Sequence, residues 1–426
     1  SRLVGNGNGN NYCRLQQHQT TKRNHGTMTG FQIQNSKVVN EAKAGVPILT
    51  GIGYLDHMID QLNSHAQVGV GLQVVLLGEG DADDVTDKNR LSTQNQAELC
   101  SLVGAELGAT LNAIAAETSP STPSRFCCPL DEALVECVLS PAAAETGTLQ
   151  EYTLPPYGIY PKDIGRSKIG QLETAAIESF WKALAASAKL DITFQKLRGD
   201  NGHHIVESSF KAFSRALRNY LDPPGLFDAA SANEQASVAL ARTASISRST
   251  KETSISVELR LDGTTGNSVV DTGIPVLDEF FTLLAEEAHM TLKIHCKGDL
   301  YVDDHHTAED VSIAVGQCLT QALGTKAGLN RMWLAEATGG GAKVEVTMDL
   351  SNRPCLRHNL HESLGRQEYI VEGESSPLSC EMLEHVLESL VMNGRMTVHV
   401  VEVEAGASLK DSVMCTATAF GKALFA

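Results

Sequence analysis

The sequence lacks the cysteine patterns that staple extracellular domains or build thiolate metal sites. Its 10 cysteines are scattered over 426 residues, only Cys127 and Cys128 are adjacent, and no pair has the Cys-x-x-Cys spacing. Disulfide frameworks and thiolate zinc sites normally show regular or paired spacings. The pattern therefore indicates a chain that works in a reducing compartment.

Positive charge and long apolar runs are also scarce. The chain has 34 Lys and Arg against 51 Asp and Glu, a net charge of -17. This balance argues against nucleic acid as the main partner, although a few clustered cations would suffice for a small phosphate compound. No apolar run approaches the roughly 20 residues that a membrane-spanning helix needs, so we expect no membrane partner.

Acidic residues are missing from the first forty positions, which contain basic residues and a Gly/Asn run over 5–11. Such a composition cannot build a core. We interpret residues 1–30 as a disordered basic leader, with Met28 near the true start. The alternative is the remnant of an organelle-targeting segment, which is typically basic and poor in acid. The expected location is the cytoplasm, or a plastid under the second interpretation.

Two similar halves are what the sequence does contain. Thr50–Asp56 recurs as Thr272–Asp278, and Phe210–Leu217 recurs as Ala417–Leu424. Pro-Pro-Gly at 223–225 ends a helix, and an Ala/Ser-rich stretch follows. We therefore expect domains at 31–225 and 249–426, joined by a linker at 226–248. Strand-like and helix-like hydrophobic patterns are interleaved in both halves, which predicts the α+β class.

The form His-His-x-x-Glu occurs once in each half. Residues four apart lie on one face of a helix, so His203 with Glu207, and His305 with Glu309, can each hold one ion. The adjacent histidines point elsewhere and can serve a second ion. Imidazole and carboxylate ligands without thiolate suit Mn, Fe, Co or Zn. The predicted metal ligands are His57, His203, His204, Glu207, His305, His306, Glu309 and His385.

These ligands lie in four motifs: Leu55-Asp-His-Met58, Asp303-Asp-His-His-Thr-Ala-Glu-Asp310, Leu383-Glu-His385, and a longer one from Gly202 to Phe213 that ends in Phe-Lys-Ala-Phe. Together they resemble the imidazoleglycerol-phosphate dehydratase family, a metal-dependent hydro-lyase family of histidine biosynthesis. The resemblance implies two dehydratase-like domains, each of two βα repeats with helices sandwiched between β-sheets (ribosomal S5 domain 2-like). It also implies a large homo-oligomer, of about twelve chains for a fused pair.

The departures from the family pattern are reciprocal. The first half has Thr93, Gln94 and Ala97 in place of the early His-His-x-x-Glu, and Ser179 in place of the Glu-His histidine. The second half has Glu279 in place of the Leu-Asp-His histidine, and Lys410, Asp411 and Met414 in place of the late His-His-x-x-Glu. The two halves together keep one complete set of eight ligands. We expect a composite site, formed within one chain or between chains.

Further roles follow from the resemblance alone. Arg331, Arg353 and Lys211 match phosphate contacts, and guanidinium and ammonium groups suit a phosphate dianion. Gln61 is a candidate substrate contact, and Glu252 is a candidate catalytic acid or base. His65 is expected to be structural.

The implied reaction removes water from D-erythro-imidazoleglycerol phosphate and gives imidazoleacetol phosphate. Two divalent ions per site, Mn²⁺ in the first instance, would act on the ring nitrogens. Two alternatives remain open at this point. One is a non-catalytic homologue that binds metal as a structural or regulatory scaffold. The other is a different dimetal lyase or hydrolase acting on another azole phosphate.

Overall fold

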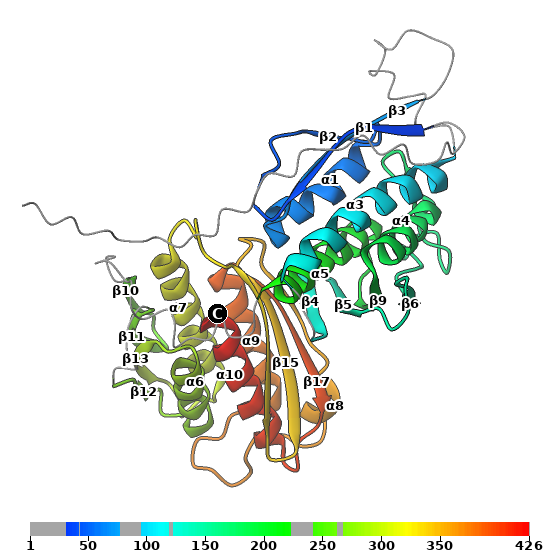
Figure 1. Cartoon of the computed structure of the whole chain (residues 1–426). Coiled ribbons are helices and arrows are strands. Elements are labelled where there is room, and N and C mark those ends of the chain that lie inside the picture. The colour runs from blue at the N-terminus through cyan, green and yellow to red at the C-terminus, as the bar shows by residue number, and fades with distance from the viewer. Residues whose placement is uncertain are drawn as a thin grey trace, which may run out of the picture.

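The computed structural model describes residues 31–41, 43–76, 95–118, 122–222, 242–261 and 267–425. The expected leader at 1–30, positions 93 and 94, and most of the expected linker lie outside these ranges. The described residues form two lobes that correspond to the two halves of the sequence (Figure 1).

The second half has two four-stranded sheets with helices between them (Figure 1). One sheet has the order β10 (Thr243–Ser249), β11 (Thr253–Arg260), β13 (Thr291–Gly298), β12 (Val269–Asp271). The other has the order β14 (Met332–Gly339), β15 (Ala342–Asp349), β17 (Thr397–Glu404), β16 (Cys355–Arg357). The helices are α6 (Pro275–Glu287), α7 (His305–Leu323), the short α8 (His361–Leu364), α9 (Cys380–Gly394) and α10 (Leu409–Phe425).

The first half repeats this plan. Its sheets have the orders β1 (Phe31–Val39), β3 (Gly69–Leu76), β2 (Ile48–Leu49) and β4 (Ser124–Leu130), β5 (Ala133–Pro141), β9 (Leu190–Arg198), β6 (Leu149–Tyr152). A small hairpin pairs β7 (Lys168–Ile169) with β8 (Leu172–Glu173). The helices are α1 (Gly53–Gln61), the π-helical η1 (Leu62–Ala66), α3 (Gln96–Thr118), α4 (Thr174–Ala188) and α5 (Gly202–Leu221). The α+β fold of two repeated domains is therefore confirmed.

Close helix contacts fix the alignment of the two halves. Gly104 on α3 lies against α4, where an added Cβ would come within 2.3 Å of the Phe180 carbonyl oxygen. Gly316 on α7 lies against α9, where an added Cβ would come within 2.7 Å of the Leu390 carbonyl oxygen. Only glycine allows such approaches. With these glycines as equivalents, Ala97 occupies the position of Glu309, as the sequence comparison predicts.

Helix α3 corrects the expectation that no segment has the length and apolarity of a membrane span. Among the described residues, this one helix, Gln96–Thr118, satisfies both conditions. It packs through Gly104 and Gly108 on α4, and Leu99, Val103 and Leu107 are fully buried in the first-half core. A core helix passes the same test of length and composition, and these contacts are those of a core helix.

The two halves meet along β4, which contacts β14, β15 and β17. Two guanidinium nitrogens of Arg125 donate to the two carboxylate oxygens of Glu345, at 3.0 and 2.9 Å. Met332 on β14 is 1% exposed and belongs to the core of the first half. The halves are therefore joined by a polar and apolar seam as well as by the chain.

The second domain begins earlier than expected. Strand β10 pairs antiparallel with β11 from Thr243 to Ser249, so the expected linker at 226–248 overlaps a strand. Strand β10 could not be recognised in the sequence because it is rich in Ser and Thr. None of its side chains is fully buried, and the apolar alternation typical of a strand is weak.

Candidate metal and phosphate site

The first half gathers three predicted ligands. Helix α5 begins after Asn201, whose side chain accepts a hydrogen bond from the His203 amide at 2.9 Å. Tyr54 on α1 donates to the His203 carbonyl oxygen at 3.1 Å and holds the two helices together. Ligand atoms of His57, His203 and Glu207 consequently lie within 4.8 Å of one another. Donors around one ion, with bonds of roughly 2.1 Å, lie about 3–4 Å apart, so this set fits a divalent metal.

Lysine 211 completes the charge balance of this cluster. The Glu207 carboxylate lies 3.2 Å from His203 Nε2, 3.9 Å from His57 Nε2 and 2.8 Å from Lys211 Nζ. Burial opposes ionisation of Glu207, but Lys211 and the histidines outweigh it, and the pKa of this carboxyl is lowered. Glu207 is therefore an anion at neutral pH, as a metal ligand must be.

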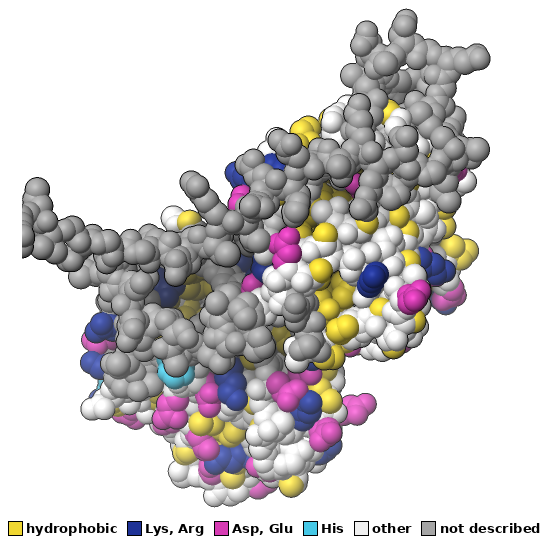
Figure 2. Space-filling view, in the orientation of Figure 1, with side chains coloured by type: hydrophobic (Ala, Val, Ile, Leu, Met, Phe, Trp, Pro, Cys, Tyr) yellow, Lys and Arg dark blue, Asp and Glu magenta, His cyan; other side chains and the backbone are white. Residues whose placement is uncertain are grey.

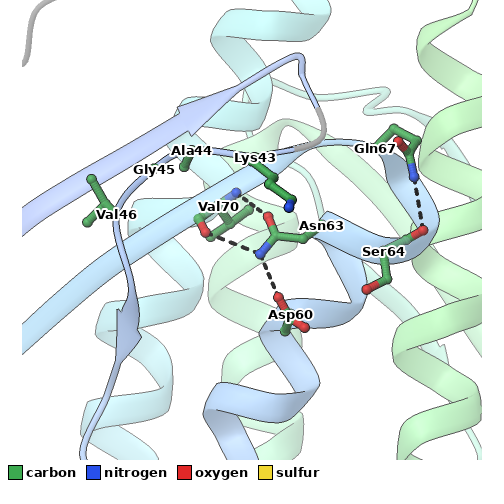
Figure 3. Close-up of a pocket in the computed structure, with 9 residues that line it drawn as sticks. All are labelled: Lys43, Ala44, Gly45, Val46, Asp60, Asn63, Ser64, Gln67 and Val70. Atoms are coloured by element: carbon green, nitrogen blue, oxygen red, sulfur yellow. Dashed lines mark hydrogen bonds between the residues drawn. The ribbon is translucent and has the colours of Figure 1, made fainter.

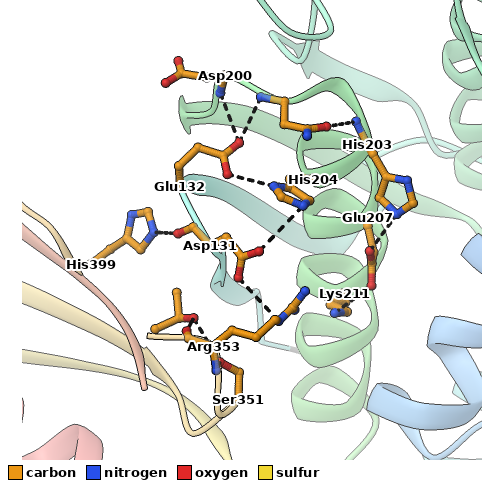
Figure 4. Close-up of polar contacts among 12 residues, drawn as sticks. Asp131, Glu132, Asp200, His203, His204, Glu207, Lys211, Ser351, Arg353 and His399 are labelled. Carbon is orange, nitrogen blue, oxygen red and sulfur yellow. Dashed lines mark hydrogen bonds and ion pairs between the residues drawn. The ribbon is translucent and has the colours of Figure 1, made fainter. Parts of the chain in front are cut away.

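His204 points away from His203, as predicted, toward an acidic turn. Its Nδ1 lies 2.8 Å from Glu132 Oε2, and its Nε2 lies 3.7 Å from Asp131 Oδ2 (Figure 4). Glu132 also accepts the amide of Asn201 at 2.9 Å. A carboxylate on Nδ1 orients a histidine and leaves Nε2 for a metal. Sequence reasoning assigned no role to Asp131 and Glu132, although an acidic pair in the tight turn between two strands was an available signal.

The second half holds its ligands more loosely. His305 Nε2 lies 3.7 Å from Glu309 Oε2, and the rings of His305 and His385 lie 5.4 Å apart. Asp304 accepts both the amide and the hydroxyl of Ser379, at 2.6 and 2.8 Å, which ties the start of α7 to the start of α9. His306 Nδ1 lies 3.1 Å from Asp299, an arrangement that parallels His204 and Glu132.

Residues at or beside the positions where a half lacks a predicted ligand form other ion pairs. In the second half, Glu279 stands where the first half has His57, and Lys410 stands where it has His203. These two residues form an ion pair at 2.6 Å. An ammonium group thus lies where the first half has its candidate ligand cluster. In the first half, Ser179 replaces the histidine of α9, and Glu178 beside it pairs with Lys182 at 2.7 Å.

The two arginines that were predicted to bind phosphate, Arg331 and Arg353, lie at the seam between the halves. Arg353 Nε lies 3.5 Å from Asp131 Oδ1, and Asp131 in turn faces His204 (Figure 4). Arg331 Nε lies 3.3 Å from Asp349, a carboxylate 1% exposed at the end of β15. Burial raises the pKa of Asp349, and Arg331, Lys211 and Arg353 oppose that rise. Cations from both halves therefore surround Asp349 at the seam, and Asp349 is a third residue that sequence reasoning missed.

Three other predicted residues have definite places. Gln61 is 5% exposed, and its amide donates to the His57 carbonyl oxygen at 3.0 Å, so in this arrangement it supports α1 instead of facing a ligand. Glu252 lies in the turn between β10 and β11, near enough to His306 to raise its pKa together with Asp299, the main cause. His65 lies in η1, and burial together with Lys211 and Arg331 lowers its pKa to about 3.

A surface cavity of about 490 Å³ lies apart from these clusters, between residues 43–46 and the end of α1 (Figure 3). Asn63 spans it by donating to Asp60 at 2.7 Å and accepting the Val70 amide at 2.6 Å. No predicted metal or phosphate ligand lines this cavity.

Comparison with known proteins matches both halves of the chain to the same family. The family model of imidazoleglycerol-phosphate dehydratase matches residues 50–217 and again 272–424. Imidazoleglycerol-phosphate dehydratase 1 of Arabidopsis thaliana, named as chloroplastic, is 36% identical over 194 residues, which are 46% of this chain and 68% of that protein. The enzyme of Kineococcus radiotolerans is 39% identical over 161 residues, 38% of this chain and 78% of that protein.

A crystal structure of the Staphylococcus aureus enzyme aligns with 43% of this chain and 95% of that chain, at 24% identity and a TM-score of 0.36. The two family matches cover most of the sequence and coincide with the two lobes. The chain therefore belongs to the imidazoleglycerol-phosphate dehydratase family, as a tandem arrangement of two family domains.

Proposed function

We propose that this chain is a metal-dependent hydro-lyase of histidine biosynthesis that dehydrates imidazoleglycerol phosphate to imidazoleacetol phosphate at a site composed of both halves. One observation carries the proposal. The four predicted ligands of the first half (His57, His203, His204 and Glu207) lie near the seam that Arg331 and Arg353 of the second half also reach. The other four (His305, His306, Glu309 and His385) are neighbours in the second half. Divergence without a function would not keep eight ligands in two such groups.

Metal and substrate have separate places in this proposal. Two divalent ions, Mn²⁺ in the first instance, would be held by the eight predicted ligands. When bound, they would stabilise negative charge on the nitrogens of the imidazole ring. Lys211, Arg331 and Arg353 would bind and orient the phosphate through charge-assisted hydrogen bonds. Glu252, beside His306, would move the proton at the glycerol carbon that is deprotonated.

The halves of the site would meet between chains. Among the described residues, no group of three ligands combines the first half with the second. Large apolar side chains are exposed beside both sets of ligands. Tyr301 (91% exposed) and Val302 (57%) precede His305 in the second half. In the first half, Ile159 is 48% exposed, and its amide donates to the carbonyl oxygen of Asp200, just before α5. Such exposed residues beside functional groups are typical of an interface. We therefore propose a large homo-oligomer of about twelve chains.

The surface fits this assembly. Figure 2 shows hydrophobic side chains on the visible face of the first half and acidic and basic side chains intermixed over the second. Tyr160 and Ile164 are 76% and 72% exposed, and both belong to the loop that follows β6. The proposed location is the cytoplasm or a plastid, since named relatives include chloroplastic and bacterial enzymes.

The test is dehydratase activity of the intact, metal-loaded chain on imidazoleglycerol phosphate. We expect activity that a chelator removes and that Mn²⁺ restores. His203→Gln and His305→Gln should each lower kcat by at least about a hundredfold, because each removes a metal ligand. The matched control is His295→Gln, an exposed histidine whose contact is the single carboxylate Asp271 at 3.1 Å. An inactive, metal-loaded wild-type chain would instead support the scaffold alternative.

A further inference from the structure

A second cluster of imidazole and carboxylate groups lies outside the site described above. His358 follows β16, His361 begins α8, and Glu384 lies on α9. One ligand atom from each lies within 4.8 Å of the other two. We propose that these three residues form an additional divalent-metal site in the second half, of the kind that takes Zn²⁺ or Co²⁺.

The distances between the three groups are close to those between ligand atoms that share one ion. His361 Nδ1 lies 2.7 Å from Glu384 Oε1, and His358 Nε2 lies 3.9 Å from the same oxygen. The two rings lie 4.5 Å apart. Ligand atoms around an ion with bonds of roughly 2.0–2.2 Å are about 3–4 Å apart, so shifts of less than about 1 Å would seat the ion. Two nitrogens and one oxygen, with a position left open, suit Zn²⁺ or Co²⁺.

The backbone that presents the histidines is held in place. Asn359, between them, donates to the Glu402 carbonyl oxygen at 3.1 Å and accepts the Glu402 amide at 2.7 Å. The Ser363 hydroxyl donates to the Glu402 carboxylate at 2.7 Å. These bonds attach the segment to β17. A ligand set on pinned backbone loses little conformational freedom when an ion binds.

This cluster is separate from the predicted dehydratase ligands. Glu384 and His385 are neighbours on α9, but successive helical residues point about 100° apart. His385 lies against His305, whereas Glu384 faces His358 and His361. Among the described residues of the first half, no copy of this cluster forms, and Glu178, the counterpart of Glu384, pairs instead with Lys182. The site is therefore expected once per chain.

The experiment is a Co²⁺ titration of the metal-free full-length chain, with bound metal counted after removal of free ion and with the visible absorption of Co²⁺ recorded. We expect His361→Gln to bind one equivalent fewer than the wild type. The side chain of His361 is 67% exposed, so the substitution should not disturb folding. Glu384→Gln should lose the same equivalent, and its matched control Glu178→Gln should lose none.

Two comparisons make the result decisive. His203→Gln should keep the absorption band that His361→Gln removes, which separates this site from the dehydratase ligands. Within the described ranges, His295 and Asp271 form a pair without a third ligand group close enough to share an ion, so His295→Gln should bind as much Co²⁺ as the wild type does. Equal stoichiometry and equal spectra for the wild type, His361→Gln and Glu384→Gln would overturn the proposal, whatever the dehydratase activity of the chain.

Discussion

At the scale of single residues, carboxylates on α5 and in the turn between β4 and β5 face the predicted first-half ligands. His-His-x-x-Glu on a helix predicts that the two histidines diverge, and His203 and His204 do face Glu207 and Glu132. The acidic turn Asp131-Glu132 and the strand-end residue Asp349 were not predicted because they lie far in sequence from groups that interact with them, His204 and Arg353 for the turn and Lys211 for Asp349. Their role depends on tertiary contacts that no spacing along the chain encodes.

Glu132 should matter for metal affinity although it is not a predicted ligand. Glu132→Gln removes the charged partner of His204 Nδ1 and weakens the hold on the imidazole ring. We expect the first-half set to lose about 10- to 100-fold in metal affinity, measured by competition with a chromophoric chelator. Glu178→Gln, an exposed carboxylate at a degenerate position, is the control. Unchanged affinity in Glu132→Gln would show that His204 needs no such support.

His399 should give the seam a pH dependence. Its Nε2 lies 2.8 Å from the Asp131 carbonyl oxygen, and burial, reinforced by Arg198 and Arg357, lowers its pKa to about 4. The unfolded chain takes up a proton near pH 6.5 that the folded chain accepts only near pH 4. Stability from this residue is therefore full above about pH 6.5 and falls as the pH drops toward 4.

The magnitude follows from the same two pKa values. Between pH 7 and pH 5, His399 should account for about 2 kcal/mol of lost stability. The free energy of unfolding, measured with urea at both pH values, should fall less in His399→Gln than in the wild type, and the difference should equal that amount. His295→Gln, which is exposed, should leave the loss unchanged. The same pH dependence in His399→Gln would contradict the assignment of a buried neutral imidazole.

At the scale of elements, hydrophobic periodicity predicted the strands and helices well, and the boundaries less well. Helices α5 and α7 begin at Gly202 and His305, ahead of their apolar stretches, so that the histidine pairs lie inside the first helical turn. Strand β10 escaped because its alternation is polar. The seam between β4 and the sheet of the second half could not be predicted, because Arg125 and Glu345 are 220 residues apart in sequence.

The Arg125–Glu345 pair should contribute measurably to the joining of the halves. Glu345 is 7% exposed, and Arg125→Ala would leave both this carboxylate and that of Glu136, which Arg125 also contacts, without their cation. We expect a loss of about 3 kcal/mol in the free energy of unfolding, seen as a lower urea midpoint. Lys293→Ala, which breaks the exposed pair with Glu258, should cost less than about 1 kcal/mol. Equal costs for the two variants would show that the seam pair adds little.

The degenerate set of the second half should be open to restoration. Glu279→His, Lys410→His and Met414→Glu together would copy His57, His203 and Glu207 onto α6 and α10. Since Glu279 and Lys410 already touch, the new ligand atoms should converge. We expect the triple variant to bind more metal per chain than the wild type, by elemental analysis after dialysis. The double variant that omits Met414→Glu is the control and should bind more weakly.

At the scale of the whole molecule, the sequence predicted two family domains and a shared site, but not how the site is divided. In the structure, Arg353 pairs with Asp131, which faces His204 of the first half, and both Arg331 and Lys211 act on the carboxylate of Asp349 in the same chain. It leaves His305, Glu309 and His385 in a separate group. We infer that one chain supplies the first-half ligands and both arginines, and that another chain supplies the second histidine set.

Complementation between inactive variants tests this division most directly. His203→Gln and His305→Gln chains, unfolded together and reassembled, should recover about a quarter of wild-type activity, because that fraction of sites draws both intact parts from different chains. Arg353→Gln should likewise recover with His305→Gln but not with His203→Gln, although Arg353 belongs to the second half. Failure of His203→Gln and His305→Gln to complement would place each site within one chain. Recovery of activity when Arg353→Gln is mixed with His203→Gln would contradict the inference that Arg353 and His203 of one chain serve the same site.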